Sequence, residues 1–125
     1  MSQIQDSWIS KITEKEYFKS LSHPRFLELD GLIVLESHYT PEAFEQWKTV
    51  LEKNSAPADL GKIENTINHV HLDDLTTDEG QQNEIGEYLR KIWIDTAVVQ
   101  FPNYEFECQV KRFEQGWELV MQRRR

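Results

Sequence analysis

The sequence predicts an α+β fold, in which an antiparallel sheet built from two β-hairpins carries three to four helices on one face. Helical spacing of apolar residues dominates positions 40–99, whereas apolar and polar residues alternate over positions 104–121. An Asp-Gly pair between two short apolar runs near the N-terminus indicates a further pair of strands. Helices and strands that occupy separate stretches of a chain are typical of this class.

Length and charge exclude several classes of protein. The chain has 125 residues and a mass of 14.9 kDa, so we expect residues 1–125 to form one domain. Its formal net charge of −8 argues against binding to nucleic acid or to an anionic membrane surface. No apolar run approaches the ~20 residues of a membrane-spanning helix. Because the single cysteine cannot form an internal disulfide, the sequence predicts a cytoplasmic protein.

The N-terminal third predicts a helix followed by a hairpin. Apolar residues recur at helical intervals within positions 1–22, and His23-Pro24 should end the helix because a residue before proline avoids helical geometry. A two-residue turn at Asp30-Gly31 would pair Leu29 with Leu32. The alternative is one longer strand with a bulge at the glycine.

Three central helices follow. The first is expected at residues 41–53, with Thr40 as the N-cap and proline at the first helical position. The second should be capped by Asp59 and end near Leu72, and the third should be capped by Thr76 or Thr77 and end before Pro102. We expect an inner stripe on the third helix that reaches Val99, and the residues predicted to be buried across the three helices are Phe44, Trp47, Leu51, Ile63, Ile67, Ile85, Leu89 and Ile92.

The C-terminal segment predicts a second hairpin. Apolar residues alternate with polar ones from Tyr104 to Val110 and again after Trp117. A two-residue turn at Gln115-Gly116 would pair Val110 with Met121 and bring the apolar faces of both strands together. Cys108 then lies on the apolar face, which favours a core thiol over a nucleophile. The run of three arginines at positions 123–125 is expected to be a solvated terminus.

Two histidines and nearby acids form the pattern most typical of a metal site. On a strand, His69 and His71 would project to one face and could bind zinc, iron or manganese together with Asp73. On a helix, the same histidines would diverge by about 200°. Because the apolar spacing from Leu60 to Val70 is helical, the sequence predicts no metal and no other cofactor.

The middle of the chain is acidic. Between Ile63 and Leu89 there are seven acids and no lysine or arginine, and a charge run of this kind is either a solvated face or a surface for a basic partner. The residues chosen for a partner surface are Asp73, Asp74, Asp78, Glu79 and, as an exposed aromatic, Trp8.

Catalytic signatures such as GxSxG, GxGxxG and HExxH do not occur in the sequence. The sequence therefore favours a non-enzymatic protein-interaction module or regulator, with a basic protein or a second copy of the chain as its partner. The alternatives are a small metal-dependent enzyme built on His69 and His71, and a domain that binds an apolar small molecule between sheet and helices.

Overall fold

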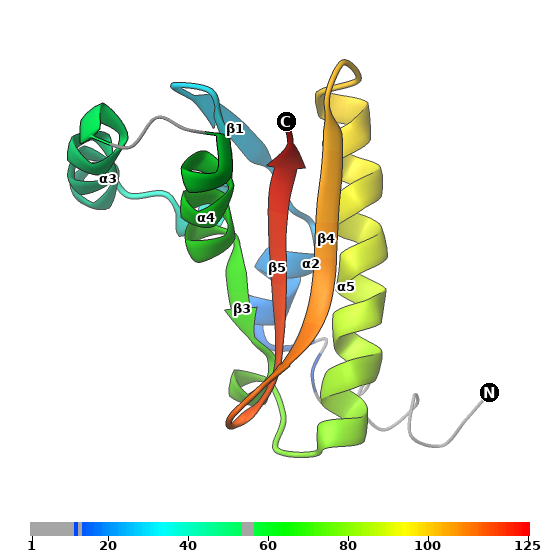
Figure 1. Cartoon of the computed structure of the whole chain (residues 1–125). Coiled ribbons are helices and arrows are strands. Elements are labelled where there is room, and N and C mark those ends of the chain that lie inside the picture. The colour runs from blue at the N-terminus through cyan, green and yellow to red at the C-terminus, as the bar shows by residue number, and fades with distance from the viewer. Residues whose placement is uncertain (1–11, 13, 54–56) are drawn as a thin grey trace.

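The computed structural model describes residues 12, 14–53 and 57–125. Within these residues the chain forms four α-helices and two antiparallel sheets of two and three strands, which confirms the α+β class (Figure 1). The two hairpins contribute to separate sheets rather than to a single one. None of the described helices is both long enough and apolar enough to span a membrane.

The first hairpin has the predicted register. Strands β1 (Phe26–Leu29) and β2 (Leu32–Leu35) pair so that Leu29 lies opposite Leu32. The turn residues Asp30 and Gly31 have φ values of 52° and 83°, the left-handed conformation that a tight hairpin turn requires at both positions. The Asp-Gly pair therefore fixes this register locally.

Both faces of β2 are buried. Ile33 and Leu35 pack into the main core with α2 (Glu16–Ser22) and α5 (Glu79–Gln100). Leu32 and Val34 pack into a second, smaller core with α3 (Pro41–Lys53) and α4 (Pro57–Ile67). The sequence predicts that the helices share one face of a sheet. In the structure they instead form two groups on opposite sides of this strand.

The second sheet has the order β3-β5-β4, in which β3 spans His69–His71, β4 spans Glu105–Phe113 and β5 spans Gly116–Arg124. Its hairpin turns at Glu114-Gln115, not at the predicted Gln115-Gly116, so Val110 lies opposite Leu119 instead of Met121. Because this register differs from the predicted one by two residues, the apolar faces still coincide.

Gly116 lies outside the turn and allows a close contact between β5 and a side chain of α5. A Cβ atom at this position would lie 2.5 Å from Oε1 of Gln82 on α5. The same oxygen accepts a hydrogen bond of 3.1 Å from the backbone N–H of Trp117. Glycine is therefore needed where the helix side chain approaches the strand.

The long helix α5 runs along the second sheet (Figure 1). Asp78 caps it, accepting a 2.9 Å hydrogen bond from the N–H of Gln81, so the predicted cap at Thr76 or Thr77 is wrong. Its fully buried apolar residues are Ile85, Leu89, Trp93 and Ala97. Val99 is 80% exposed, because it lies about 200° around the helix from Ala97 and faces away from the core.

The other helices agree in part with the sequence. Helix α2 ends at Ser22, as predicted, and α3 has the predicted bounds of Pro41–Lys53. Most of the N-terminal helix predicted over residues 1–22 lies outside the described residues, as does the side chain of Leu51. Of the predicted core residues, Phe44, Ile63, Ile85 and Leu89 are buried, whereas Trp47, Ile67 and Ile92 are only partly buried.

Helix α4 ends at Ile67 and does not continue to Leu72. The chain turns at Asn68, whose carbonyl oxygen accepts a 3.1 Å hydrogen bond from the N–H of Met121. Extended backbone follows as β3, and a short 3₁₀ helix spans Leu72–Asp74. The two central histidines therefore lie on a strand, and the helical argument against a metal site no longer applies to them.

Candidate functional site

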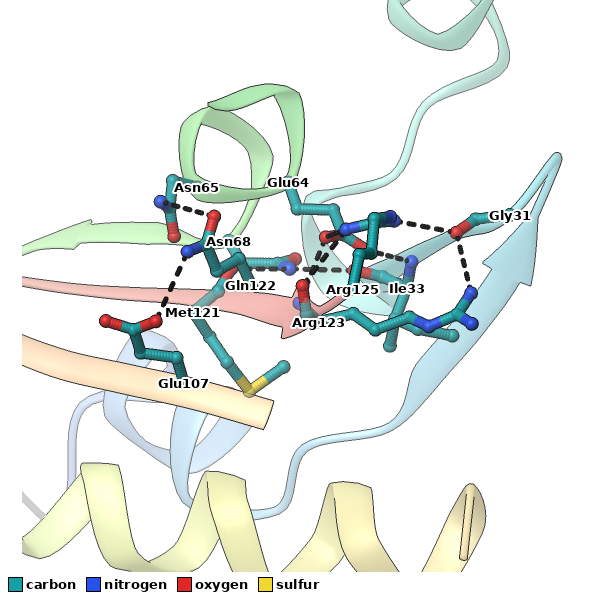
Figure 2. A network of polar contacts seen from close by, with 10 residues as sticks. All are labelled: Gly31, Ile33, Glu64, Asn65, Asn68, Glu107, Met121, Gln122, Arg123 and Arg125. Atoms are coloured by element: carbon teal, nitrogen blue, oxygen red, sulfur yellow. Dashed lines mark hydrogen bonds and ion pairs between the residues drawn. The ribbon is translucent and has the colours of Figure 1, made fainter. Parts of the chain in front are cut away.

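Glu64 lies on the buried side of α4, and Asn68 follows the end of this helix. Their side chains connect the two sheets (Figure 2). Glu64 is fully buried and accepts hydrogen bonds of 2.7 Å from the N–H of Ile33 and 3.0 Å from the N–H of Arg123. Asn68 accepts a 2.7 Å hydrogen bond from the N–H of Leu35 and donates to Met121 O at 3.2 Å. The strands β2 and β5 are thus joined by side-chain hydrogen bonds instead of the backbone hydrogen bonds of a continuous sheet.

The C-terminal arginines belong to this network. Nη1 of Arg125 lies 2.6 Å from Glu64 Oε1, and the guanidinium of Arg123 lies 3.6 Å from the ring centroid of Tyr104. The prediction of a solvated terminus is therefore wrong for Arg123 and Arg125, which bind a buried carboxylate more than fifty residues away, whereas Arg124 is exposed. An open groove of about 690 Å³ beside these arginines is also lined by Glu105 and Glu107, so it carries both charges.

His69 and His71 project from the outer face of β3, on either side of the buried Val70. The strand pairing places His71 directly opposite Glu118 of β5. Nε2 of His69 lies 2.9 Å from Oε2 of Glu118, and the two imidazole rings contact each other with centroids 4.3 Å apart. One ligand atom from each of these three residues lies within 4.8 Å of the other two.

Asp73 lies beside this cluster. Its Oδ1 is 3.9 Å from Nδ1 of His71 and is buried, and it accepts no hydrogen bond from the part of the chain that the structure describes. The ring of Phe113 also packs against His71, with centroids 4.6 Å apart. The histidine therefore lies beside both an apolar ring and a carboxylate.

The acidic residues chosen from the sequence have different roles. Asp78 caps α5, and Glu79 forms a 2.6 Å ion pair with Arg112. Asp74 is exposed at the end of the 3₁₀ helix. The structure therefore assigns local contacts to Asp73, Asp78 and Glu79, whereas Trp8 lies outside the described residues.

Cys108 is a core residue, as the sequence indicates. It is 6% exposed, and burial raises the pKa of its thiol to about 12. Because the thiolate is the nucleophilic form, this cysteine is poorly suited to catalysis near neutral pH.

Strand β4 forms one edge of the second sheet. All nine of its residues pair with β5, and no other described strand pairs with it. Because hydrogen bonds in an antiparallel ladder alternate in direction, every second residue of β4 directs its N–H and C=O away from β5. Beside this strand, α5 carries Glu87 and Arg90, which form a 2.9 Å ion pair.

Comparisons with protein-family models, curated proteins and solved structures found no match to this chain. Sequence reasoning missed Glu118 as a neighbour of the histidines, because it belongs to another strand, and the only available signal was its polar position in the alternating pattern after Trp117.

Proposed function

We propose that this chain is a non-enzymatic protein-interaction module that associates with a second copy of itself through the outer edge of β4. The carrying observation is that a strand of nine residues lies at the edge of its sheet with its outer hydrogen-bonding groups unpaired by any described strand. Such an edge is a template for an incoming strand. Main-chain hydrogen bonds would hold the two strands together, and side-chain contacts would determine their register.

The charges on β4 are self-complementary. If two copies of the strand meet antiparallel around Gln109, Glu107 of each copy lies directly opposite Lys111 of the other. Opposite charges in such a position contribute roughly 0.2–1 kcal/mol per pair. Both side chains lie on the sheet face that carries Gln109, and Lys111 is exposed. This register supports a second copy of the chain as the partner.

The hydrogen-bonding directions agree with the same register. Pairing around Gln109 places Cys108 opposite Val110 of the second copy, and both side chains lie on the sheet face that does not carry Gln109. If the turn at Glu114-Gln115 closes with a hydrogen-bonded pair, the even-numbered residues of β4 direct their backbone groups outward. Cys108 and Val110 would then exchange hydrogen bonds across the new junction.

An unlike, basic partner is the second candidate, and the observation that favours it is the exposed carboxylate of Asp74 beside Asp73 and Asp78. Such a partner would present lysine or arginine, and its association rate would fall as salt rises because exposed charges are screened over about 8 Å at physiological ionic strength. A cytoplasmic location belongs to this proposal, with the buried thiol of Cys108 remaining reduced.

Sedimentation equilibrium of the purified chain tests the main proposal. The apparent mass should rise from 14.9 kDa toward twice that value as concentration increases, with a roughly micromolar dissociation constant because one strand junction is a small interface. Lys111→Glu should abolish the increase, whereas Lys62→Glu, on an exposed part of α4, should not. A wild-type mass that stays at the monomer value at every concentration would overturn the proposal.

A further inference from the structure

The outer face of β3 gathers a set of ligand groups that association through β4 does not use. Two imidazoles and one carboxylate are supplied by His69, His71 and Glu118, and their ligand atoms lie within 4.8 Å of one another. A tetrahedral zinc ion with ligands at about 2.1 Å needs its ligand atoms about 3.4 Å apart. The cluster is thus within a small side-chain rotation of a binding geometry.

Backbone geometry directs these side chains toward one point. His69 and His71 are two residues apart on an extended strand, so both point away from the core that holds Val70. Glu118 reaches the same point from β5, because it lies opposite His71 in the ladder. Three ligands on two paired strands are better fixed in space than ligands on a loop.

The exposure of the three residues suits an ion with an open position. The side chains of His69 and Glu118 are 28% and 21% exposed, and that of His71 is 41% exposed. Each of the three side chains is therefore packed on part of its surface and exposed to solvent on the rest. Three protein ligands and one water molecule would complete a tetrahedron.

Asp73 supplies an independent observation. Its Oδ1 is buried, receives no hydrogen bond from the described residues, and lies 3.9 Å from Nδ1 of His71. A histidine that binds a metal through Nε2 commonly donates its Nδ1–H to a carboxylate, which orients the ring. A small rotation of His71 would provide Asp73 with the donor it lacks.

From these contacts we propose that His69, His71 and Glu118 bind one divalent transition-metal ion of the zinc class, and that Asp73 is the positioning residue that orients His71. Imidazole and carboxylate ligands select such ions over Ca²⁺ and Mg²⁺, which prefer oxygen ligands throughout. The negative charges of Asp73 and Asp74 favour a cation at this end of the sheet. The ion would join the short strand β3 to β5.

Zinc chloride titrated into chelator-treated protein tests the site, with isothermal calorimetry for affinity and elemental analysis after dialysis for stoichiometry. Wild-type protein should bind one ion per chain. Either His71→Ala or the isosteric Glu118→Gln should weaken binding by at least tenfold. His23→Ala removes an exposed histidine that is not part of the cluster and is the matched control, so it should bind as wild type does.

The role of Asp73 has its own readout. Asp73→Asn should keep one ion per chain and lower the affinity by about 10- to 100-fold, as loss of an orienting carboxylate does. Cobalt(II) in place of zinc should give the visible absorption of a tetrahedral site in wild-type protein, and Asp73→Asn should alter that spectrum. The role of Asp73 would be overturned if the Asp73→Asn variant bound zinc as tightly as wild type and had the same cobalt spectrum.

The proposal of a metal site fails if wild-type protein retains no stoichiometric ion, or if His71→Ala and Glu118→Gln bind zinc as tightly as His23→Ala. Circular dichroism of each variant shows whether the fold is kept. If a variant does not fold, the proposal is tested by the stoichiometry and the cobalt spectrum of wild-type protein. A cobalt spectrum typical of six oxygen ligands would contradict the site.

Discussion

Glu64 and Asn68 lie one helical turn apart, and each side chain hydrogen-bonds both β2 and β5. The two sheets are therefore held together by a carboxylate and an amide rather than by a continuous ladder. Because both residues are fully buried, each contact is made away from competing water.

Removing the Glu64 carboxylate should strongly destabilise the fold. Glu64→Ala leaves Arg125 without its 2.6 Å partner and two backbone N–H groups without an acceptor, so we expect the free energy of unfolding to fall by about 3–5 kcal/mol. Urea denaturation measures the loss. Glu45→Ala, which breaks an exposed 3.8 Å pair with Lys48, is the control and should cost less than about 1 kcal/mol. Equal costs at the two positions would mean that the buried network contributes little.

The helix cap at Asp78 gives a smaller effect. Asp78→Ala removes the oxygen that accepts from the N–H of Gln81, and we expect a loss of about 0.5–2 kcal/mol. Asp78→Asn should retain most of the stability, because asparagine caps helices equally well. Thermal unfolding compares the three proteins, and an alanine variant as stable as wild type would contradict the cap.

The inner stripe of α5 can be separated from its outer face. Leu89→Ala removes a fully buried side chain and should cost about 2–5 kcal/mol. Ile92→Ala should cost less, because Ile92 is only partly buried. Val99→Ala, at 80% exposure, should change stability by less than about 0.5 kcal/mol. A measured order that places Val99 first would mean that the helix is rotated.

Cys108 should link stability to alkaline pH. Burial raises the pKa of this thiol from 9.0 to about 12, so the unfolded chain loses the proton first as pH rises. The contribution to stability is complete below pH 9 and is lost between pH 9 and about 12. Urea denaturation across this range should show a steeper decline for wild type than for Cys108→Ala. Identical declines would show that the thiol is not buried in solution.

Local signals predicted some elements well. The register at Asp30-Gly31 follows from the left-handed turn that this pair favours, and α3 follows from Thr40 and Pro41 at its start. The predicted position of the second hairpin turn is wrong because Gly116 is read as a turn glycine from the sequence, whereas in the structure it makes room for Gln82. A glycine required by a distant contact resembles a turn glycine when only its neighbours are visible.

Long-range contacts could not be predicted. Val70 continues the helical spacing of α4, although it faces the core from a strand. The spacing therefore predicts a helix at His69 and His71, where the structure has a strand. Glu118 and Arg125 find their partners 49 and 61 residues away in sequence. No local pattern encodes such distances.

Charge reversal across β4 tests the central claim, which is association of two copies through this edge. Lys111→Glu and Glu107→Lys should each remain monomeric alone, because like charges would meet across the junction. Mixed in equal amounts, they should form a heterodimer, since one strand carries two acids and the other two lysines at the facing positions. The measurement is sedimentation equilibrium of each variant and of the mixture, with a chelator present so that a bound ion at Glu118 cannot contribute. A mixture that stays monomeric, when wild-type protein dimerises, would contradict pairing of β4 around Gln109.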